Sequence, residues 1–311
     1  MTLDDLRVLV AVCEARSLSS AARELLCTQS AVSQHVRRLE RETGVALVDR
    51  GPKGVTATFA GRVLQEAAMD ALASLDGARR ALEELRRGET GRLRVATGGT
   101  TVRHFMSGAV VRFRARHPRA GLDLQSASST TRCIEAVRAD RADLAFVTTG
   151  PAVRGIDQVP AVRIPWALLV PASDPLGRRR ALAPAELGGI RYVALSEGST
   201  SRRQLEEALA DRGVRLVSTT SVDDWDTAGL LVELGFGEAI VPAIHASHLA
   251  GERPLRAVPI TGLPPVTFGW AARRWSALGP LALELVDTVT EEMAALGYSP
   301  AGGGAGGSVR R

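Results

Sequence analysis

Polar and basic side chains recur at helical spacing between residues 29 and 37. On a helix expected over residues 29–43, one side presents Gln29, Ser30, Ser33, Gln34 and Arg37. Amide, hydroxyl and guanidinium groups of this kind can hydrogen-bond base edges and phosphates, and the first turns of such a helix can enter the major groove of DNA. The pattern therefore predicts a helix that reads DNA.

The elements around this helix are expected to hold its apolar side. Residues 3–15 carry apolar groups at helical spacing, which predicts a helix with one buried face. Ser17 suits the N-cap of a short helix over residues 19–26, and Thr28 suits the N-cap of the DNA-reading helix. Gly44 is expected to end that helix. Together these segments predict a helix-turn-helix.

A short β-hairpin is expected over residues 45–58, with the turn at RGPKG. Arg50 and Lys53 fall near its tip, where a wing would lie along the DNA backbone or in the minor groove. Between Thr28 and Arg62 there are six basic residues and three acidic ones. A patch of this sign can neutralise a few phosphates.

One long helix without proline is expected from residue 59 to residue 87. Its apolar residues alternate steps of four and three: Leu64, Ala68, Ala71, Leu75, Ala78, Leu82 and Leu85. A period of 3.5 is typical of a coiled coil, so this helix is predicted to dimerise the chain. The alternative is an amphipathic helix that packs on its own domain. Residues 88–91 are expected to form a linker.

From residue 91 onward the pattern becomes alternating β/α, which indicates parallel sheet with helices on its faces. Strands are expected over residues 91–97, 122–127, 142–148, 166–171, 190–195, 214–220, 238–242 and 266–273. Helices are expected over residues 100–117, 131–139, 201–212, 225–234 and 278–296. The natural architecture is two α/β lobes linked by crossing strands.

Hydroxyl side chains collect where the expected strands end and the expected helices begin. The candidates for a ligand site are Thr100, Thr101, Ser129, Thr130, Thr148, Thr149, Ser199, Thr200 and Ser201, with Arg202 beside them. Open α/β sheets bind ligands at these ends, and helix N-termini offer free N–H groups to anions. A small polar effector, for example a carboxylate, is therefore expected. The alternative is that these residues are ordinary N-caps.

Signals for catalysis are missing from the sequence. It holds no G-x-S-x-G, HExxH, P-loop or CxxC pattern, and we expect neither an enzyme nor a cofactor. His245 and His248 have the spacing of metal ligands, but no acidic or cysteine partner stands near them, so no metal is expected and they are predicted to be surface or helix-end histidines. Cys133 has no evident resolving partner for redox chemistry.

Composition places the protein in a broad class. There is no run of about 18 apolar residues and the N-terminus is acidic, so we expect neither a membrane span nor a signal peptide, and a cytoplasmic location. The three cysteines are far apart, which suits a reducing compartment. The net charge of +5 is a poor guide to DNA binding, because residues 1–90 contain 13 basic and 13 acidic side chains.

The N-terminal pattern resembles the LysR-type transcriptional regulators. The matching residues are Ala21-Ala22, Gln29, Ser33, Leu39-Glu40, Gly44, Leu47, Arg50 and Thr58-x-Ala60-Gly61, and more loosely Gly91 to Leu93 and Ala142 to Ala145. The sequence departs from the family at Ser30, where proline is common, and at Val48, Lys53 and Ala57.

The resemblance implies an α+β multidomain protein with a winged helix-turn-helix, a linker helix and a bilobed α/β effector domain like the periplasmic solute-binding proteins. The expected boundaries are 1–58, 59–90, 91–298 and a disordered tail over 299–311. Lobe I would comprise 91–162 and 267–298, and lobe II 163–266. The resemblance also implies a homotetramer (a dimer of dimers), promoter DNA and RNA polymerase as partners, and an effector in the cleft that changes DNA bending.

Three other interpretations remain open on the sequence alone. A solute receptor could use the same bilobed domain, although the helix-turn-helix argues against it. An enzyme would need an acid–base or nucleophilic group that the pattern does not offer. An architectural DNA-binding protein would use the bilobed domain only to oligomerise.

Overall fold

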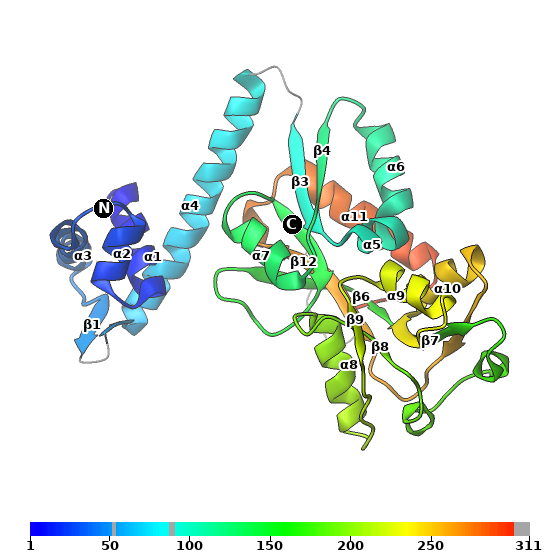
Figure 1. The fold of residues 1–311 in the computed structure, drawn as a ribbon. Coiled ribbons are helices and arrows are strands. Elements are labelled where there is room, and N and C mark those ends of the chain that lie inside the picture. The colour runs from blue at the N-terminus through cyan, green and yellow to red at the C-terminus, as the bar shows by residue number, and fades with distance from the viewer. Residues whose placement is uncertain (52–53, 87–90, 302–311) are drawn as a thin grey trace. The chain divides into compact units, whose positions relative to one another are not determined.

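The computed structural model describes residues 1–51, 54–86 and 91–301 (Figure 1). The chain forms two compact units, one of Met1–Arg87 with Arg274–Ala277 and one of Gly88–Arg273 with Leu278–Arg311. The architecture confirms the predicted fold class: a winged helix-turn-helix, a long helix, and two α/β lobes.

The N-terminal unit is a winged helix-turn-helix followed by a long helix. Its elements are α1 (Leu3–Ala15), α2 (Leu18–Glu24), α3 (Gln29–Thr43), β1 (Val48–Gly51), β2 (Gly54–Ala57) and α4 (Phe59–Arg86). Ser17 and Thr28 cap α2 and α3 as predicted, each accepting a hydrogen bond from the backbone N–H three residues on. Gly44 ends α3 with a φ of 73°, in the left-handed region that glycine adopts readily.

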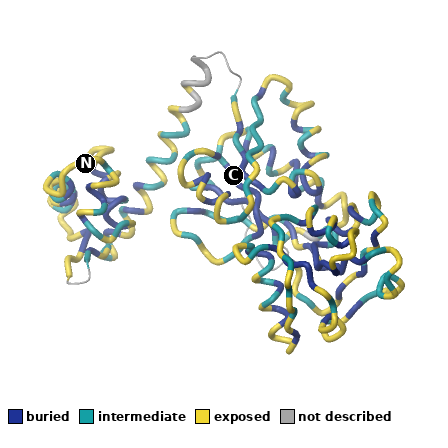
Figure 2. The backbone as a smooth tube through the Cα atoms, viewed as in Figure 1, coloured by how far each residue is buried: buried dark blue, intermediate teal, exposed yellow. Residues whose placement is uncertain are grey.

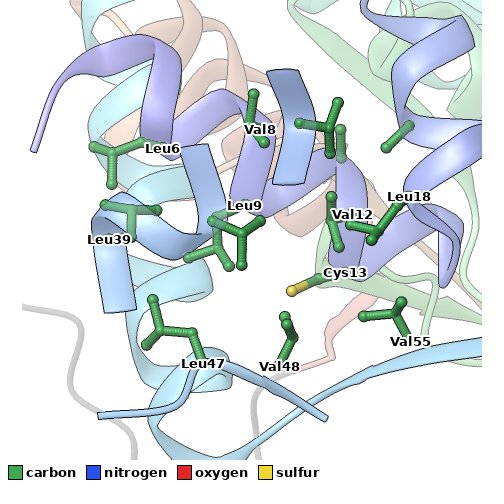
Figure 3. Close-up of a cluster of buried hydrophobic side chains, with 14 of the residues drawn as sticks. Leu6, Val8, Leu9, Val12, Cys13, Leu18, Leu39, Leu47, Val48 and Val55 are labelled. Carbon is green, nitrogen blue, oxygen red and sulfur yellow. The ribbon is translucent and has the colours of Figure 1, made fainter. Parts of the chain in front are cut away.

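The core of this unit lies where α1, α3 and the wing meet (Figure 3). Leu9, Leu39 and Leu47 are almost completely buried there. Val48 and Val55 from the wing close the same cluster. The apolar side of α3 is therefore committed to this core, and its polar side is left outside.

Asp5 is a buried carboxylate at the start of α1, and it ties α1 to α3. It accepts hydrogen bonds from His35 Nδ1 at 2.7 Å and from Arg38 Nε at 2.9 Å, and it forms a capping box with Thr2. Burial raises the pKa of Asp5, but the hydrogen bonds from Arg38, His35 and Thr2 outweigh burial and hold this pKa well below its ordinary value of 3.8. Asp5 thereby fixes how α3 lies against α1.

In α4 the predicted apolar seam divides into two parts. Leu64 and Ala68 pack against the core of the N-terminal unit. Farther along the helix, Leu75 is 47% exposed and Leu82 is 66% exposed. Leu85 is among the residues whose side chains are not described. The exposed part of the seam leaves apolar side chains uncovered on the single chain, and dimerisation through it stays a prediction.

Lobe I of the C-terminal unit is built on a six-stranded sheet of order β13-β6-β12-β5-β3-β4. The strands are β3 (Arg92–Thr97), β4 (Gly121–Ser126), β5 (Leu144–Thr148), β6 (Asp157–Ile164), β12 (Val266–Ala272) and β13 (Ser299–Pro300). The helical segments are α5 (Gly99–Thr101), the π-helical turn η1 (Val102–Met106), α6 (Ser107–Arg116), α7 (Thr130–Arg138) and α11 (Pro280–Ala295). β3, β4 and β5 run parallel, as predicted, whereas β12 runs antiparallel to its neighbours.

Lobe II contains a three-stranded sheet of order β10-β7-β11 and the pair β8-β9. The strands are β7 (Trp166–Pro171), β8 (Val193–Leu195), β9 (Thr220–Val222), β10 (Ala239–Pro242) and β11 (Leu255–Pro259). The helices are α8 (Thr200–Ala210), α9 (Trp225–Glu233) and α10 (Ala243–Glu252), with 3₁₀ turns η2 (Pro175–Arg178) and η3 (Pro184–Leu187). A further 3₁₀ turn, η4 (Trp275–Ala277), follows β12. Backbone in the strands β5, β7, β10 and β12 is mostly dark blue in Figure 2, which marks the buried core of each lobe.

Several elements differ from the sequence-based expectation. The strand expected over 214–220 begins only at Thr220. β6 was missed because Pro160 stands inside it and proline usually marks a break. There the ladder shifts register opposite Gly269, whose backbone lies so close that an added Cβ would be 2.4 Å from the carbonyl oxygen of Val159. Ser299 and Pro300, placed in the predicted disordered tail, instead pair with β6, and residues 302–311 lie outside the described residues.

The histidines of α10 correct another expectation. His245 was predicted to be a surface or helix-end residue, but it is fully buried. No helix was predicted at α10, which starts directly after Pro242, so His245 was not assigned to a buried helix face. On that helix, positions 244 to 246 face the lobe core, while His248 is exposed.

Substitution of Asp5 tests its role in holding the recognition helix. We expect Asp5→Ala to lower the free energy of unfolding by about 2 kcal/mol at neutral pH, because hydrogen bonds to a buried charge are lost. The folded-state pKa is depressed, so this contribution is present above pH 3.8 and is lost as pH falls through the lower folded value. Urea unfolding of both proteins at pH 7 and pH 3 measures the difference, which should shrink at pH 3.

The matched control is Asp4→Ala, which removes an exposed neighbouring carboxylate. A change within about 0.5 kcal/mol is expected for it. Equal losses in the two variants would show that Asp5 has no special role.

Candidate functional sites

The exposed side of α3 carries the residues predicted to read DNA. Gln29, Ser30, Gln34 and Arg37 are exposed, and Ser33 is half-buried. Their backbone is fixed by the opposite side of the helix, where Val32, Val36 and Leu39 are fully buried. The helix therefore presents amide, hydroxyl and guanidinium groups on a rigid support.

The wing lies next to this surface. Arg50 of β1 is exposed, and its guanidinium donates a hydrogen bond to Ser33 Oγ at 3.3 Å. The wing is anchored from behind, because the backbone N–H of Val55 donates to the carbonyl of Arg16 at 3.0 Å. Lys53, the other wing residue predicted to contact DNA, lies outside the described residues.

A basic hollow extends this surface at the C-terminal half of α3. It is lined by Gln34, Arg37, Arg38, Glu40, Arg41, Gly44, Val45 and Ala46. Arg41 is exposed and was missed in the sequence analysis, although it lies one turn from Arg37 on the same helix face. Arg38 lines the hollow and also donates a hydrogen bond to the buried carboxylate of Asp5. The hollow adds positive charge that suits a phosphate backbone.

A second candidate site is a cavity of about 960 Å³ between the two lobes. Seven of the ten predicted effector residues line it: Thr100, Thr101, Ser129, Thr130, Thr148, Ser199 and Thr200. The carboxyl ends of β3, β4 and β5 open onto this cavity from lobe I, and the start of α8 opens onto it from lobe II. The structure thus brings together most of the set that the sequence suggested.

The other three predicted residues are turned elsewhere. Thr149 lines a different cavity and donates through Oγ1 to the carbonyl of Thr267 at 3.2 Å. Ser201 is buried and hydrogen-bonds Ser199 Oγ at 2.9 Å. The guanidinium of Arg202 binds the carbonyl of Leu195 and the carboxylate of Glu206. None of the three lines the cavity between the lobes.

The lining hydroxyls fall into two kinds. Ser129 and Ser199 are N-caps of α7 and α8, so each already accepts a backbone hydrogen bond. Thr100 and Thr101 make no side-chain hydrogen bond with another described residue, and they stand in the first turn after β3. Hydroxyls of the second kind keep their hydrogen-bonding capacity for a ligand.

Charged and aromatic residues complete the cavity, and the sequence analysis missed them. They are Arg132, Glu135, Arg141, Phe146, Asp223, Asp224, Trp225, Asp226 and Phe268. The acidic group could have been found by the same strand-end reasoning, but the strand before it was placed too early in the chain. With β9 ending at Val222, Asp223 and Asp224 are the residues that follow a strand and precede a helix.

Cys133 also lines this cavity. Burial raises the pKa of its thiol to about 12, so the thiol remains protonated at neutral pH. Within the described part of the chain, no group of three or more His, Cys, Asp or Glu side chains is arranged to hold a metal ion. Over the same residues, no helix is long and apolar enough to cross a membrane.

Comparison with known proteins agrees with this geometry. Residues 3–62 match the bacterial regulatory helix-turn-helix protein, lysR family, and residues 86–294 match the LysR substrate binding domain. A probable RuBisCO transcriptional regulator of Porphyra purpurea is 30% identical over 77% of each chain. The RuBisCO operon transcriptional regulator of Allochromatium vinosum is 29% identical over 94% of this chain and 97% of that protein.

A solved structure extends the comparison to the whole fold. Full-length CbnR in complex with its target DNA is 22% identical, covers 94% of this chain and 99% of its own, and superposes with a TM-score of 0.55. This chain belongs to the LysR family. It is a DNA-binding transcriptional regulator with an effector-binding domain, in a family of regulators and not of enzymes.

Substitution of Arg37 tests the recognition surface. Arg37→Ala should weaken operator binding by roughly 1–3 kcal/mol if the side chain contacts a base. The measurement is a gel-shift titration at fixed salt on a fragment that the wild-type protein binds. Arg180→Ala, which removes an exposed arginine of lobe II, is the control for net charge and should leave affinity unchanged. Equal affinity of Arg37→Ala and wild type would remove this residue from the site.

Proposed function

We propose that the protein binds a pseudo-palindromic promoter site as a dimer or a dimer of dimers, and that a small molecule in the cleft between the lobes changes how it bends DNA. A protein that acts on chromosomal DNA in this way would work in the cytoplasm. RNA polymerase would be a further partner. The observation that carries the proposal is the hydroxyl-lined cavity between the lobes, which belongs to the same chain as an exposed recognition helix.

For DNA contacts, the proposal assigns base reading and phosphate binding to α3 and the wing. The residues are Gln29, Ser30, Ser33, Gln34, Arg37, Arg50 and Lys53. Support comes from the exposure of the α3 side chains and from the hydrogen bond that joins Arg50 to Ser33. Two copies related by a two-fold axis would meet two half-sites, which accounts for the symmetry of the site.

For the effector, the proposal favours a small polar molecule with a carboxylate. The cavity of about 960 Å³ suits a small molecule. Its walls include Arg132 and the starts of α7 and α8, which offer N–H groups and positive charge to an anion, while Asp223, Asp224 and Asp226 on the same walls suit hydroxyl or amino groups of the ligand. Thr100, Thr101 and Thr200 would supply the neutral hydrogen bonds that orient the ligand.

For oligomerisation, the proposal uses the exposed seam of α4. Leu75 and Leu82 lie seven residues apart, which puts them on one face of a coiled coil. Both side chains are exposed on the single chain, so a second copy of α4 would bury them.

An acidic residue in the seam tests this interface. Leu82→Asp should shift the protein toward monomer, because a carboxylate would be buried against apolar side chains. Sedimentation velocity at several concentrations measures the distribution. Leu82→Met keeps an apolar side chain and should retain the wild-type distribution. If Leu82→Asp has the same distribution as wild type, this part of α4 does not dimerise the chain.

Footprinting tests the response to an effector. DNase I footprints on the upstream intergenic region, with and without a metabolite pool, should show an extended footprint that shortens or loses a hypersensitive band when the pool is added. Thr100→Val keeps the shape of the side chain and removes its hydroxyl, so it should bind DNA normally and lose most of this response. Thr290→Val removes a hydroxyl that bonds its own helix, and it should respond as wild type does.

Two results would count against the proposal. A footprint that never changes with any metabolite fraction would favour an architectural DNA-binding protein. A full response in Thr100→Val would remove the first turn after β3 from the effector site.

A further inference from the structure

Three of the five histidines in the chain meet where lobe I packs against lobe II. His104 comes from η1 of lobe I, and His245 and His248 come from α10 of lobe II. The ring of His104 lies 4.7 Å from that of His245 and 5.0 Å from that of His248, centroid to centroid. Neither the recognition surface nor the effector residues proposed above account for this cluster.

Hydrogen bonds from His104 join the two lobes. Its Nε2 lies 2.8 Å from Oδ1 of Asp226 on α9, and its Nδ1 lies 3.0 Å from Nδ1 of His248 on α10. The His104 side chain is itself almost completely buried. A second interlobe link is the ion pair of Arg103 with Glu252 at 2.5 Å. Both links start in the π-helical turn, a local widening of the helix that often occurs at functional positions.

The positions of the protons follow from these contacts. An ionised carboxylate only accepts, so Nε2 of His104 must donate to Asp226. In neutral His104 the other nitrogen, Nδ1, then carries a lone pair, and Nδ1 of His248 must be the donor across the 3.0 Å contact. Both hydrogen bonds are therefore satisfied when the two imidazoles are neutral.

One additional proton leaves this arrangement intact. His104 can hold it, so that Nδ1 of His104 donates to a lone pair on Nδ1 of His248, and its contact with Asp226 becomes an ion pair. A second proton places an N–H on both Nδ1 atoms, which then face each other with like charge. The hydrogen bond between His104 and His248 cannot survive that state.

The groups around the pair oppose a second proton. Burial is the main cause that lowers the pKa of His248, and the neighbouring charges of His104 and Arg103 lower it further. The carboxylate of Glu252 raises this pKa, but the lowering effects prevail. Burial holds the pKa of His245 well below its ordinary value, so this ring stays neutral against Trp225 and Phe105. Helix α11 also packs against η1, and its Glu292 is paired with Arg112. His248 is exposed, which gives protons a route to the pair.

The cluster also reaches the effector cavity. Asp226 and Trp225 line that cavity, and η1 directly follows Thr100 and Thr101, which line it from lobe I. A proton on His104 therefore adds a positive charge beside a carboxylate of the cavity wall, at the point where the two lobes pack together.

We infer that His104 and His248 form a protonation-sensitive latch between the lobes, which couples pH to the effector cavity through Asp226. The latch is closed when the pair carries no extra proton or one, and it opens when the pair carries two. Its coupling to an effector rests on the function proposed above, whereas the latch itself is a property of the free protein.

The sign of the pH dependence follows from the lowered pKa of His248. At His248 the folded state binds fewer protons than the unfolded chain, so the contribution of His248 to stability is present above pH 6.5 and is lost as pH falls below it. This direction distinguishes the latch from a histidine stabilised by an acidic partner alone, which would lose its contribution on raising pH.

Nuclear magnetic resonance of the full-length protein labelled with ¹⁵N-histidine tests the proton positions. At pH 8 we expect His104 as the Nε2–H tautomer and His248 as the Nδ1–H tautomer, with His248 titrating below 6.5. His248→Gln and His104→Gln assign the two signals. The Nε2–H tautomer for His248 at pH 8, or titration of His248 at or above 6.5, would overturn the inference.

Thermal unfolding tests the latch itself without any effector. His248→Asn keeps a donor where Nδ1 stands and cannot be protonated. Between pH 7.5 and pH 5.5 the wild-type Tm, followed by tryptophan fluorescence, should fall further than that of His248→Asn by about 2–4 °C. His117→Gln is the control, because His117 pairs with Glu284 inside lobe I, and its Tm should fall at least as far as that of the wild type. Parallel curves for wild type and His248→Asn would exclude the latch.

The footprinting assay then tests the coupling to the cavity. If the latch is present and the cavity binds an effector, the metabolite response of the wild type should change between pH 7.5 and pH 5.5 more than that of His248→Asn. If the Tm curves differ as expected but neither protein responds to metabolites, the proposed effector function fails and the latch stands. If both respond identically at the two pH values, the coupling fails and the effector function stands.

Discussion

The C-terminal unit depends on the way its chain passes between two sheets. β6 leads into β7 through Pro165, and β11 returns to β12 through residues 260–265. Because β6 and β12 are neighbours in the lobe I sheet, the chain leaves lobe I and returns to it through adjacent strands. Two rigid lobes joined through adjacent strands have a cleft between them by construction, and the strand and helix ends that face it become its walls.

This constraint explains why hydroxyl and acidic residues gather in the cavity. Each α/β unit places the end of a strand and the start of a helix on the same side, and helix starts favour Ser, Thr and Asp as caps. Ser129, Ser199 and Asp224 serve as caps in this way. The residues that cap the helices therefore also make the cavity polar. The cavity can bind a polar ligand without an additional segment inserted into the fold.

Local patterns in the sequence were enough to predict the helix-turn-helix, the long helix and most of the parallel strands. They sufficed because caps such as Thr28 and the periodic burial of Val32, Val36 and Leu39 act over only a few residues. The errors arose where distant segments decide the outcome. β6 tolerates Pro160 because β6 bulges there, with Ala161 left out of the register with β12, and His245 is buried because η1 of the other lobe covers it. Neither neighbour is close in the sequence.

The candidate sites divide in the same way. The side chains of α3 could be assigned from helical spacing alone. In the cavity, Thr100 was found from a strand end and Thr200 from a helix start, whereas Arg202 is close to Thr200 in sequence but binds Glu206 of its own helix. Spacing along the chain cannot show which way a long side chain turns, because that depends on the partners within its reach.

The partly exposed seam of α4 has a consequence for how the folded state is maintained. Leu75 and Leu82 remain in water as long as the chain is alone, and pairing with a second copy would remove that exposed apolar surface only from the folded form. Resistance to unfolding would then follow mass action and rise with the number of copies in the cell. A regulator built in this way is least durable when it is scarce, so its lifetime and its abundance would be linked through one helix.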